Sequence, residues 1–355
     1  MYGYQSLQDY LFLMLYGGVA MLLFAAGIYL WLRRANAIAP GITPPNALRL
    51  WTAAFLFMAA LSHIWWYVLG VHWLTDDRLI RNIITITLDR ITLVPLMMAV
   101  LLSVLQDRRH RLWPWVLVHV PLIAIAAVGI TKHDPFYLFE LADYWQIAVM
   151  FVFILYYIFA MLKYNRWLRE NYADLEHKEV WQSMLLVMIL SVVYEIYTTN
   201  AGELAKEYLS QFATLLIIGF LLWRVETLQQ LDPIDEEKEV TTKGIDMGAL
   251  LKQNCEDKQL FLQHDLTLQQ LATIVGTNRT YLSAFFAQQG ITYNTYINRL
   301  RIKHFIRLYH ENKDTMPSTT AITLAQQSGF HSYSTFSAAF KRYTGTTVTE
   351  WMKSD

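Results

Sequence analysis

Long apolar runs occupy most of the first two thirds of the chain, and short amphipathic segments occupy the rest. A bilayer core requires about 20 helical residues, because each residue of a helix rises about 1.5 Å. Seven runs approach or exceed this length, near residues 10–32, 50–74, 83–105, 112–130, 144–162, 181–200 and 209–223. Because a helix satisfies its own backbone hydrogen bonds in lipid, each run predicts a membrane-spanning helix and not a buried strand.

The pattern changes after the last apolar run. Residues 224–231, RVETLQQL, place Val225, Leu228 and Leu231 on one face, which predicts that the last span continues as a short juxtamembrane helix up to Pro233. The acidic stretch DEEKEV that follows is typical of a solvated linker. The predicted fold class is all-α. The predicted domains are a seven-helix transmembrane bundle over 1–224, a juxtamembrane helix and acidic linker over 225–245, and a soluble helical domain over 246–355.

The soluble tail contains two copies of a helix, a glycine-bearing turn and a second helix. In the first copy, Gly276 marks the turn and Asn278 is the expected N-cap of the second helix. In the second copy, Gly329 marks the turn and Ser332 is the expected N-cap. The residues expected to form the core are Met247, Leu250, Leu251, Leu260, Leu262, Leu268, Leu271, Ala272, Leu324, Ala325, Phe330, Phe336 and Phe340. This layout predicts a tandem helix-turn-helix, in which each second helix enters the major groove of DNA.

Charge is distributed unevenly, although the 29 basic and 29 acidic residues cancel. Residues 1–223 contain 15 basic and 15 acidic side chains, residues 225–265 contain 4 and 10, and residues 266–355 contain 9 and 4. A basic tail favours a polyanionic partner such as DNA, and an ordinary solvated surface is the alternative. The single cysteine, Cys255, excludes an intramolecular disulfide and a multi-cysteine metal site, and we expect no metal and no cofactor.

Lysine and arginine also predict the orientation of the spans, because they collect on the cytoplasmic side of a membrane. The alternate connections 33–49, 106–111 and 163–180 contain ten of them, whereas 75–82, 131–143 and 201–208 contain four. The N-terminus is therefore expected outside and the tail in the cytoplasm. An odd number of spans would place the tail in the same compartment as DNA, as in a multi-pass protein of the bacterial inner membrane.

The tail also resembles a known family. The repeated units, the linker helix containing Arg301, the pair Gly329-Phe330 and the closing FKRYTGTTVTEW together resemble the AraC/XylS family of bacterial transcription regulators. The resemblance covers the chain from about residue 246 to its end and implies two recognition helices that bind adjacent major-groove segments. The sequence departs from the family at Val348, where proline is usual, and at Ala284 and Ala338, where long polar side chains often contact bases.

Helical geometry then selects candidate DNA contacts on the first turns of each recognition helix, away from its apolar face. The expected base-facing residues are Arg279, Thr280 and Ser283 in the first unit and His331, Tyr333, Ser334 and Ser337 in the second. Lys341 and Arg342 are expected to bind phosphates. Ordinary polar surface is the alternative for the whole set, and packing under Phe330 is the alternative for Tyr333. Arg301 is expected to brace the two subdomains without contacting a base.

Ionisable residues within the spans indicate a candidate ligand pocket, because burying charge in a bilayer is costly unless the group is paired or lines a cavity. The candidates are His63, Asp89, Arg90 and Glu195, with Trp65, Trp66, Tyr67, Tyr194 and Tyr197 as possible walls. Structural pairing of Asp89 and Arg90, interfacial aromatic residues and a hydrogen-bonded core histidine are the alternatives.

These patterns favour a membrane-embedded transcription regulator whose bundle senses an external or membrane signal. Its expected partners are double-stranded DNA, RNA polymerase, the lipid bilayer, an unknown small molecule or membrane signal, and a second copy of the chain. A transporter or channel with a gating tail, and a passive membrane anchor, are the rival hypotheses. We find no GxSxG or HExxH motif and no Ser/His set within the spans, so no catalytic residue is expected.

Overall fold

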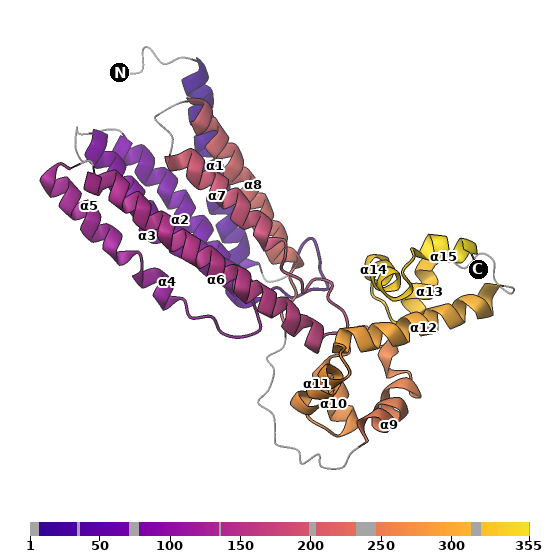
Figure 1. Cartoon of the computed structure of the whole chain (residues 1–355). Helices are drawn as coiled ribbons and strands as arrows, with labels where there is room; N and C mark the ends of the chain where they lie inside the picture. Colours follow the sequence, from indigo (N-terminus) through magenta and orange to yellow (C-terminus); the bar gives the residue numbers. More distant parts are fainter. Residues whose placement is uncertain are drawn as a thin grey trace. The chain divides into compact units, whose positions relative to one another are not determined.

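The computed structural model describes residues 7–33, 36–70, 78–134, 136–198, 204–231, 246–313 and 321–354. Within these residues the regular structure is helical apart from one isolated β-bridge, which confirms the expected all-α class (Figure 1). The chain divides into two compact units. Unit 1 comprises Met1–Leu162 and Val180–Leu231, and unit 2 comprises Lys163–Glu179 and Asp232–Asp355.

Unit 1 is built from the apolar helices. They are α1 (Leu7–Leu32), α2 (Asn46–Gly70), α3 (Arg78–Val104), α4 (Trp113–Leu117), α5 (Val120–Lys132), the π-helix η1 (Phe136–Glu140), α6 (Leu141–Asn171), α7 (Ser183–Thr198) and α8 (Leu204–Thr227). Helix α2 packs between α1 and α3, and α8 packs on both α1 and α7. Helix α6 begins in unit 1 and ends in unit 2.

Six segments of the described chain are long and apolar enough to cross a membrane. They are Tyr10–Leu32, Asn46–Tyr67, Ile80–Val104, Trp113–Lys132, Leu141–Asn171 and Leu204–Thr227. They match six of the seven expected spans. The remaining one, expected over 181–200, corresponds to α7, whose 16 residues rise about 24 Å and fall short of a bilayer core of about 30 Å.

Large apolar side chains remain exposed on the outside of unit 1. Met14 is 74% exposed on α1, Phe159 is 69% exposed on α6 and Leu216 is 64% exposed on α8. A soluble monomer rarely exposes apolar surface on several neighbouring helices. Together with the length of the helices, this surface suggests association with a membrane.

The end of α8 differs from the expected juxtamembrane helix. The helix ends at Thr227, and the next four residues are not helical. Leu228 and Leu231 are buried in unit 1, and the Gln106 side chain donates to the Gln229 carbonyl and accepts from the Leu231 amide. The apolar face therefore packs against the helical bundle itself instead of extending beyond it. The predicted helical continuation was wrong over residues 228–231, and the rest of the predicted juxtamembrane segment and linker, 232–245, lies outside the described residues.

Unit 2 contains the tail. Its helices are α9 (Met247–Leu251), the π-helix η2 (Lys252–Glu256), the 3₁₀ helix η3 (Leu260–Leu262), α10 (Leu268–Val275), α11 (Arg279–Gln288), α12 (Tyr293–Lys313), α13 (Ala321–Gln327), α14 (Tyr333–Thr344) and α15 (Val348–Ser354). One buried core contains residues of α9, α10, α11 and the start of α12. A second contains residues of the rest of α12 and of α13, α14 and α15. Helix α12 thus links two helix-turn-helix subdomains (Figure 1).

Candidate functional site

The first helix-turn-helix is formed by α10 and α11. Thr267 and Gln270 form a capping box at the start of α10, and Gly276 ends that helix with a φ of +80°. Asn278 then caps α11, because its side-chain oxygen accepts from the Tyr281 amide at 2.7 Å. The expected turn and N-cap are therefore confirmed, and they fix the direction in which α11 leaves the turn.

The second helix-turn-helix is formed by α13 and α14. Gly329 adopts a φ of +89°, and Ser332 caps α14 through a bond from the Thr335 amide at 3.4 Å. Phe330, Phe336 and Phe340 are each at most 1% exposed. The expected turn, cap and inward aromatic face are confirmed, so the opposite face of α14 points away from the core.

The candidate base-facing residues occupy these outward faces to different degrees. Thr280, His331, Tyr333 and Ser334 are exposed, whereas Ser283 and Ser337 are half-buried. Tyr333 is 36% exposed although its ring lies 5.6 Å from that of Phe336, so packing does not remove it from the surface. The candidate phosphate-binding residues Lys341 and Arg342 are exposed in the last turn of α14.

Arg279 is placed differently from its neighbours on α11. It is the first residue of the helix and is only half-exposed. Its Nη1 donates to Oδ1 of Asn171, the last residue of α6, at 2.9 Å. This partner lies 108 residues away in the sequence, and no periodicity or motif indicates it.

Arg301 braces the two subdomains, as expected. It is 1% exposed, and its guanidinium donates to the carbonyl oxygens of Phe261, Gln263 and His264 at 2.8, 2.6 and 3.2 Å. The same group lies 5.7 Å from the ring centroid of Phe330 in the second subdomain. Burial lowers the pKa of this guanidinium from its usual value, but arginine stays charged at neutral pH.

The departure at Val348 is accommodated locally. Val348 is 2% exposed and begins α15, and the preceding Thr347 caps that helix together with Glu350. The Thr347 amide donates to Glu350 Oε2 at 3.0 Å, and the Glu350 amide donates to Thr347 Oγ1 at 3.3 Å. The bond from the Thr347 amide, followed by one from the Thr347 side chain, lowers the pKa of the Glu350 carboxyl. A capping box therefore supplies the turn that the family forms with proline.

Unit 1 contains a cavity of about 240 Å³ that is lined by three of the four candidate pocket residues, His63, Asp89 and Arg90. Most of the remaining lining is apolar, with Leu93, Met97 and Phe153 among it. The side chain of Glu195 lies outside the described residues, as do those of Tyr194 and Tyr197. Whether Glu195 reaches this cavity therefore remains a prediction.

Both charged residues of the cavity have protein partners. Asp89 accepts from Ser62 Oγ at 2.7 Å, from Trp65 Nε1 at 3.1 Å and from Trp66 Nε1 at 2.7 Å. The Arg90 guanidinium pairs with Asp143 on α6. Trp65 and Trp66 thus contribute hydrogen-bond donors, a role that the sequence did not indicate.

His63 joins α2 to two other helices at the same cavity. One ring nitrogen lies 2.8 Å from the Ala59 carbonyl oxygen, and the other lies 3.1 Å from Gln211 Oε1 on α8. The hydroxyl of Tyr16 on α1 donates to the His63 carbonyl at 2.7 Å. His63 therefore contacts α8 through its ring and α1 through its backbone carbonyl.

Comparisons with known proteins agree with this geometry in the tail. Residues 271–354 match the family described as "Helix-turn-helix domain". An uncharacterized HTH-type transcriptional regulator of Staphylococcus aureus (strain MRSA252) is 29% identical over 102 residues, which are 28% of this chain and 13% of that protein. The chain thus matches only a small part of this relative's length, and no solved structure matches it. Residues 271–354 therefore form a DNA-binding helix-turn-helix domain of the AraC/XylS type.

Proposed function

We propose that this protein is a membrane-embedded transcription regulator that binds specific DNA sequences through α11 and α14 and responds to a signal in its membrane domain. The observation that supports this most directly is the presence, in one chain, of an AraC/XylS-type domain and six helices of membrane-spanning length. The signal would change either the fraction of DNA sites that the tail occupies or the contacts of the bound tail with RNA polymerase. The protein would bind as one chain or as a homodimer on repeated sites.

Specificity is proposed to reside at the starts of the two recognition helices, on the faces that point away from their apolar cores. In this proposal Arg279, Thr280 and Ser283 contact bases from α11, and His331, Tyr333, Ser334 and Ser337 contact bases from α14. Arginine is the commonest specific contact, through O6 and N7 of guanine, and a good bidentate pair contributes about 1–3 kcal/mol of discrimination. Lys341 and Arg342 would add affinity without sequence information, because phosphates are the same at every base pair.

Genome-wide mapping of DNA bound by the full-length protein in cells tests this function. We expect discrete enriched sites with a shared motif, and we expect Ser334→Ala to change preference at one motif position. Lys341→Ala with Arg342→Ala should instead weaken all sites together and reduce the slope of log affinity against log salt by about 1.8. Uniform coverage of the genome, indistinguishable from a control without the protein, would contradict sequence-specific binding.

The membrane domain is proposed to sense its signal through the cavity at His63, Asp89 and Arg90. A volume of about 240 Å³ with mostly apolar walls suits a small lipophilic molecule that has one polar group at the Asp89 end. Combining Asp89→Asn, Arg90→Gln and Glu195→Gln should abolish the response of a target promoter to its inducing condition. Met97→Trp, which fills the apolar part, is the matched steric variant. An unchanged response in both would favour the rival hypothesis of a passive anchor.

A further inference from the structure

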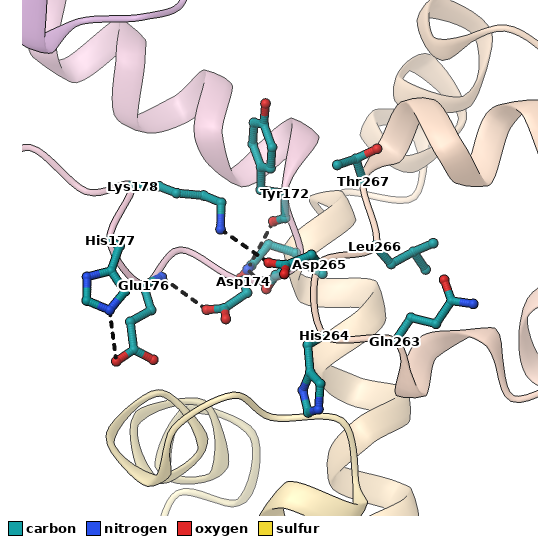
Figure 2. Close-up of polar contacts among 12 residues, drawn as sticks. Tyr172, Asp174, Glu176, His177, Lys178, Gln263, His264, Asp265, Leu266 and Thr267 are labelled. Carbon is teal, nitrogen blue, oxygen red and sulfur yellow. Dashed lines mark hydrogen bonds and ion pairs between the residues drawn. The ribbon is translucent and has the colours of Figure 1, made fainter. Parts of the chain in front are cut away.

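The end of α6 and the loop after it pack against the first helix-turn-helix subdomain within unit 2. We call residues 171–178 the docking segment. Asn294 in the first turn of α12 is 6% exposed, and its Nδ2 donates to the carbonyl oxygens of Tyr172 and Ala173 at 3.3 and 2.6 Å. Tyr172 also forms an antiparallel β-bridge with Thr267, the N-cap of α10 (Figure 2). Backbone groups of the docking segment are therefore bound by residues at the starts of both α10 and α12.

Ala173 contributes to the core of the subdomain. It is 1% exposed and belongs to the same buried cluster as Leu271, Phe286 and Ile297. A methyl group fits this position, whereas a longer or charged side chain would have to displace these neighbours. The contact is therefore a packed interface and not a surface touch between two polar loops.

Lys178 closes the other end of the docking segment. It is 4% exposed, and its Nζ lies 3.6 Å from Asp265 Oδ1 and 5.8 Å from the ring centroid of Tyr172 (Figure 2). The Asp265 side chain is 69% exposed, so this ion pair contributes little free energy. The pair instead fixes the position of the docking segment, because a buried lysine needs a partner at a defined place.

Arg279 is the residue through which the docking segment reaches the recognition helix. Its Nη1 donates to Asn171 Oδ1 at 2.9 Å, and Asn171 is 6% exposed and held in turn by a bond from its own Nδ2 to the Trp167 carbonyl at 2.7 Å. An arginine held in this way is not positioned to contact a guanine. Residues 170–179 also contain four acidic side chains and one lysine, a charge that repels DNA phosphates.

We propose that the docking segment and DNA compete for the first helix-turn-helix, so that the docked state binds DNA weakly and release of residues 171–178 permits binding. This inference rests on the proposed function, because it assigns Arg279 to DNA. The docking segment directly continues α6, whose earlier turns belong to the membrane domain and include Asp143, the partner of Arg90 at the cavity. A signal that shifts α6 would therefore reach the DNA-binding surface through one continuous helix.

A reversible cross-link tests the competition in the full-length protein. The pair Tyr172→Cys and Thr267→Cys, in a Cys255→Ala background, places two thiols on bridged residues, whose Cβ atoms lie about 4.5–5.5 Å apart, near the disulfide range. The Cys255→Ala protein, oxidised in parallel, is the matched control. The probe is duplex DNA of random sequence at about 50 mM salt, where phosphate contacts are strong.

We expect the oxidised protein to bind this DNA at least about tenfold more weakly than the same protein after reduction, because the covered face loses phosphate contacts. Excess DNA should also slow formation of the cross-link, because competition between two partners is reciprocal. Equal affinity of the oxidised and reduced forms, or failure of the cross-link to form, would overturn this proposal alone. Absence of binding by the reduced form and by the control would overturn the proposed function and this proposal with it.

A substitution without cysteines provides a second test. Ala173→Asp introduces a charge into the packed interface and should release the docking segment, which raises DNA affinity at least about tenfold if Arg279 becomes available. Arg169→Asp changes an exposed residue two positions before Asn171 and should not raise the affinity, since it adds negative charge and leaves the packing of Ala173 unchanged. Equal effects of the two variants would contradict the competition.

Discussion

Arg301 shows how one buried residue fixes the relation between the two helix-turn-helix subdomains. Replacing it by leucine leaves the carbonyl oxygens of Phe261, Gln263 and His264 without their donor. The bond to Phe261 is buried, and the other two are partly buried. An unpaired buried group costs about 1–3 kcal/mol, so Arg301→Leu should destabilise unit 2 by at least about 1 kcal/mol. Amide hydrogen exchange of peptides from residues 260–310 measures this loss.

Arg299→Leu is the control for Arg301→Leu, because Arg299 lies two residues earlier on α12 and is exposed. We expect its exchange rates to change by the equivalent of less than about 0.5 kcal/mol. Similar losses in the two variants would show that the helix as a whole, and not the brace, responds to the substitution.

The reactivity of Cys255 measures how often the core of the first helix-turn-helix subdomain opens. It is fully buried, and burial followed by the nearby Glu256 charge raises the pKa of its thiol to about 12. Because the thiolate is the nucleophile, the folded protein should resist alkylation at pH 8 and react only when the subdomain opens. Iodoacetamide labelling followed by mass spectrometry measures the rate, which should rise steeply in urea. Rapid labelling of the native protein at pH 8 would contradict this burial.

At the scale of single residues, the sequence predicted the local features and not the long-range ones. The caps at Asn278 and Ser332 follow from short-range hydrogen bonding, which depends on neighbouring residues. The bond between Asn171 and Arg279 joins residues 108 positions apart, and the pairing of Arg90 with Asp143 joins residues 53 apart. Such partners depend on how the helices pack against one another, and this packing cannot be inferred from the pattern of a single sequence.

At the scale of elements, the turn before α14 depends on close backbone contact. A Cβ added at Gly329 would lie 2.8 Å from the Leu262 Cα, and the φ of +89° is unfavourable for any other residue. Gly329→Ala should therefore destabilise unit 2 by about 2–4 kcal/mol, which combines left-handed strain of about 1–2 kcal/mol with a steric clash against backbone. Thermal unfolding of the purified protein, followed by hydrogen exchange of α13 and α14, measures this effect.

Gly345→Ala is matched to Gly329→Ala in backbone conformation. Its φ is +82°, but no atom lies within 4 Å of an added Cβ. We expect a cost of about 1–2 kcal/mol from the backbone alone. The difference between the two variants isolates the contact with Leu262, and equal costs would mean that this contact contributes nothing.

Element boundaries were predictable where a cap or glycine marks them and failed where neither is present. No internal cap or glycine marks a boundary in the apolar segment that begins at Met247, and the structure divides it into three short pieces, α9, η2 and η3, with Gln259 at a φ of +52° between the last two. Helix α8 likewise ends at Thr227, although its apolar stripe continues to Leu231. In both cases tertiary packing of the apolar residues outweighs helical periodicity.

At the scale of the whole molecule, the division into units does not follow the order of the sequence. Residues 163–179 belong to the same unit as the tail, although they connect two apolar helices whose other residues belong to unit 1. The basic residues of this connection supported a cytoplasmic location, and nothing in its pattern indicated that Ala173 packs into the core of the first subdomain. If the tail is cytoplasmic, as we propose, a connection that packs against it is also cytoplasmic. The inferred docking is thereby linked to the orientation of the spans.

That orientation leads to the last prediction, in a Cys255→Ala background with one new cysteine per variant. If connections alternate sides, Lys132→Cys at the end of α5 faces the exterior and Arg109→Cys before α4 faces the cytoplasm. A membrane-impermeant maleimide applied to intact cells should label the first and not the second, and lysis should expose both, since residues 109 and 132 are exposed in unit 1. Labelling of Arg109→Cys in intact cells would show that the bundle has the opposite orientation. With seven crossings the tail would then lie outside, and the helix-turn-helix domain would be separated from DNA. The 16-residue α7 makes this test necessary, because the side on which α8 ends depends on whether α7 crosses. A third variant, Ser354→Cys, reports on the tail. If its cysteine is not labelled in intact cells, the tail lies inside, and α7 must cross the membrane.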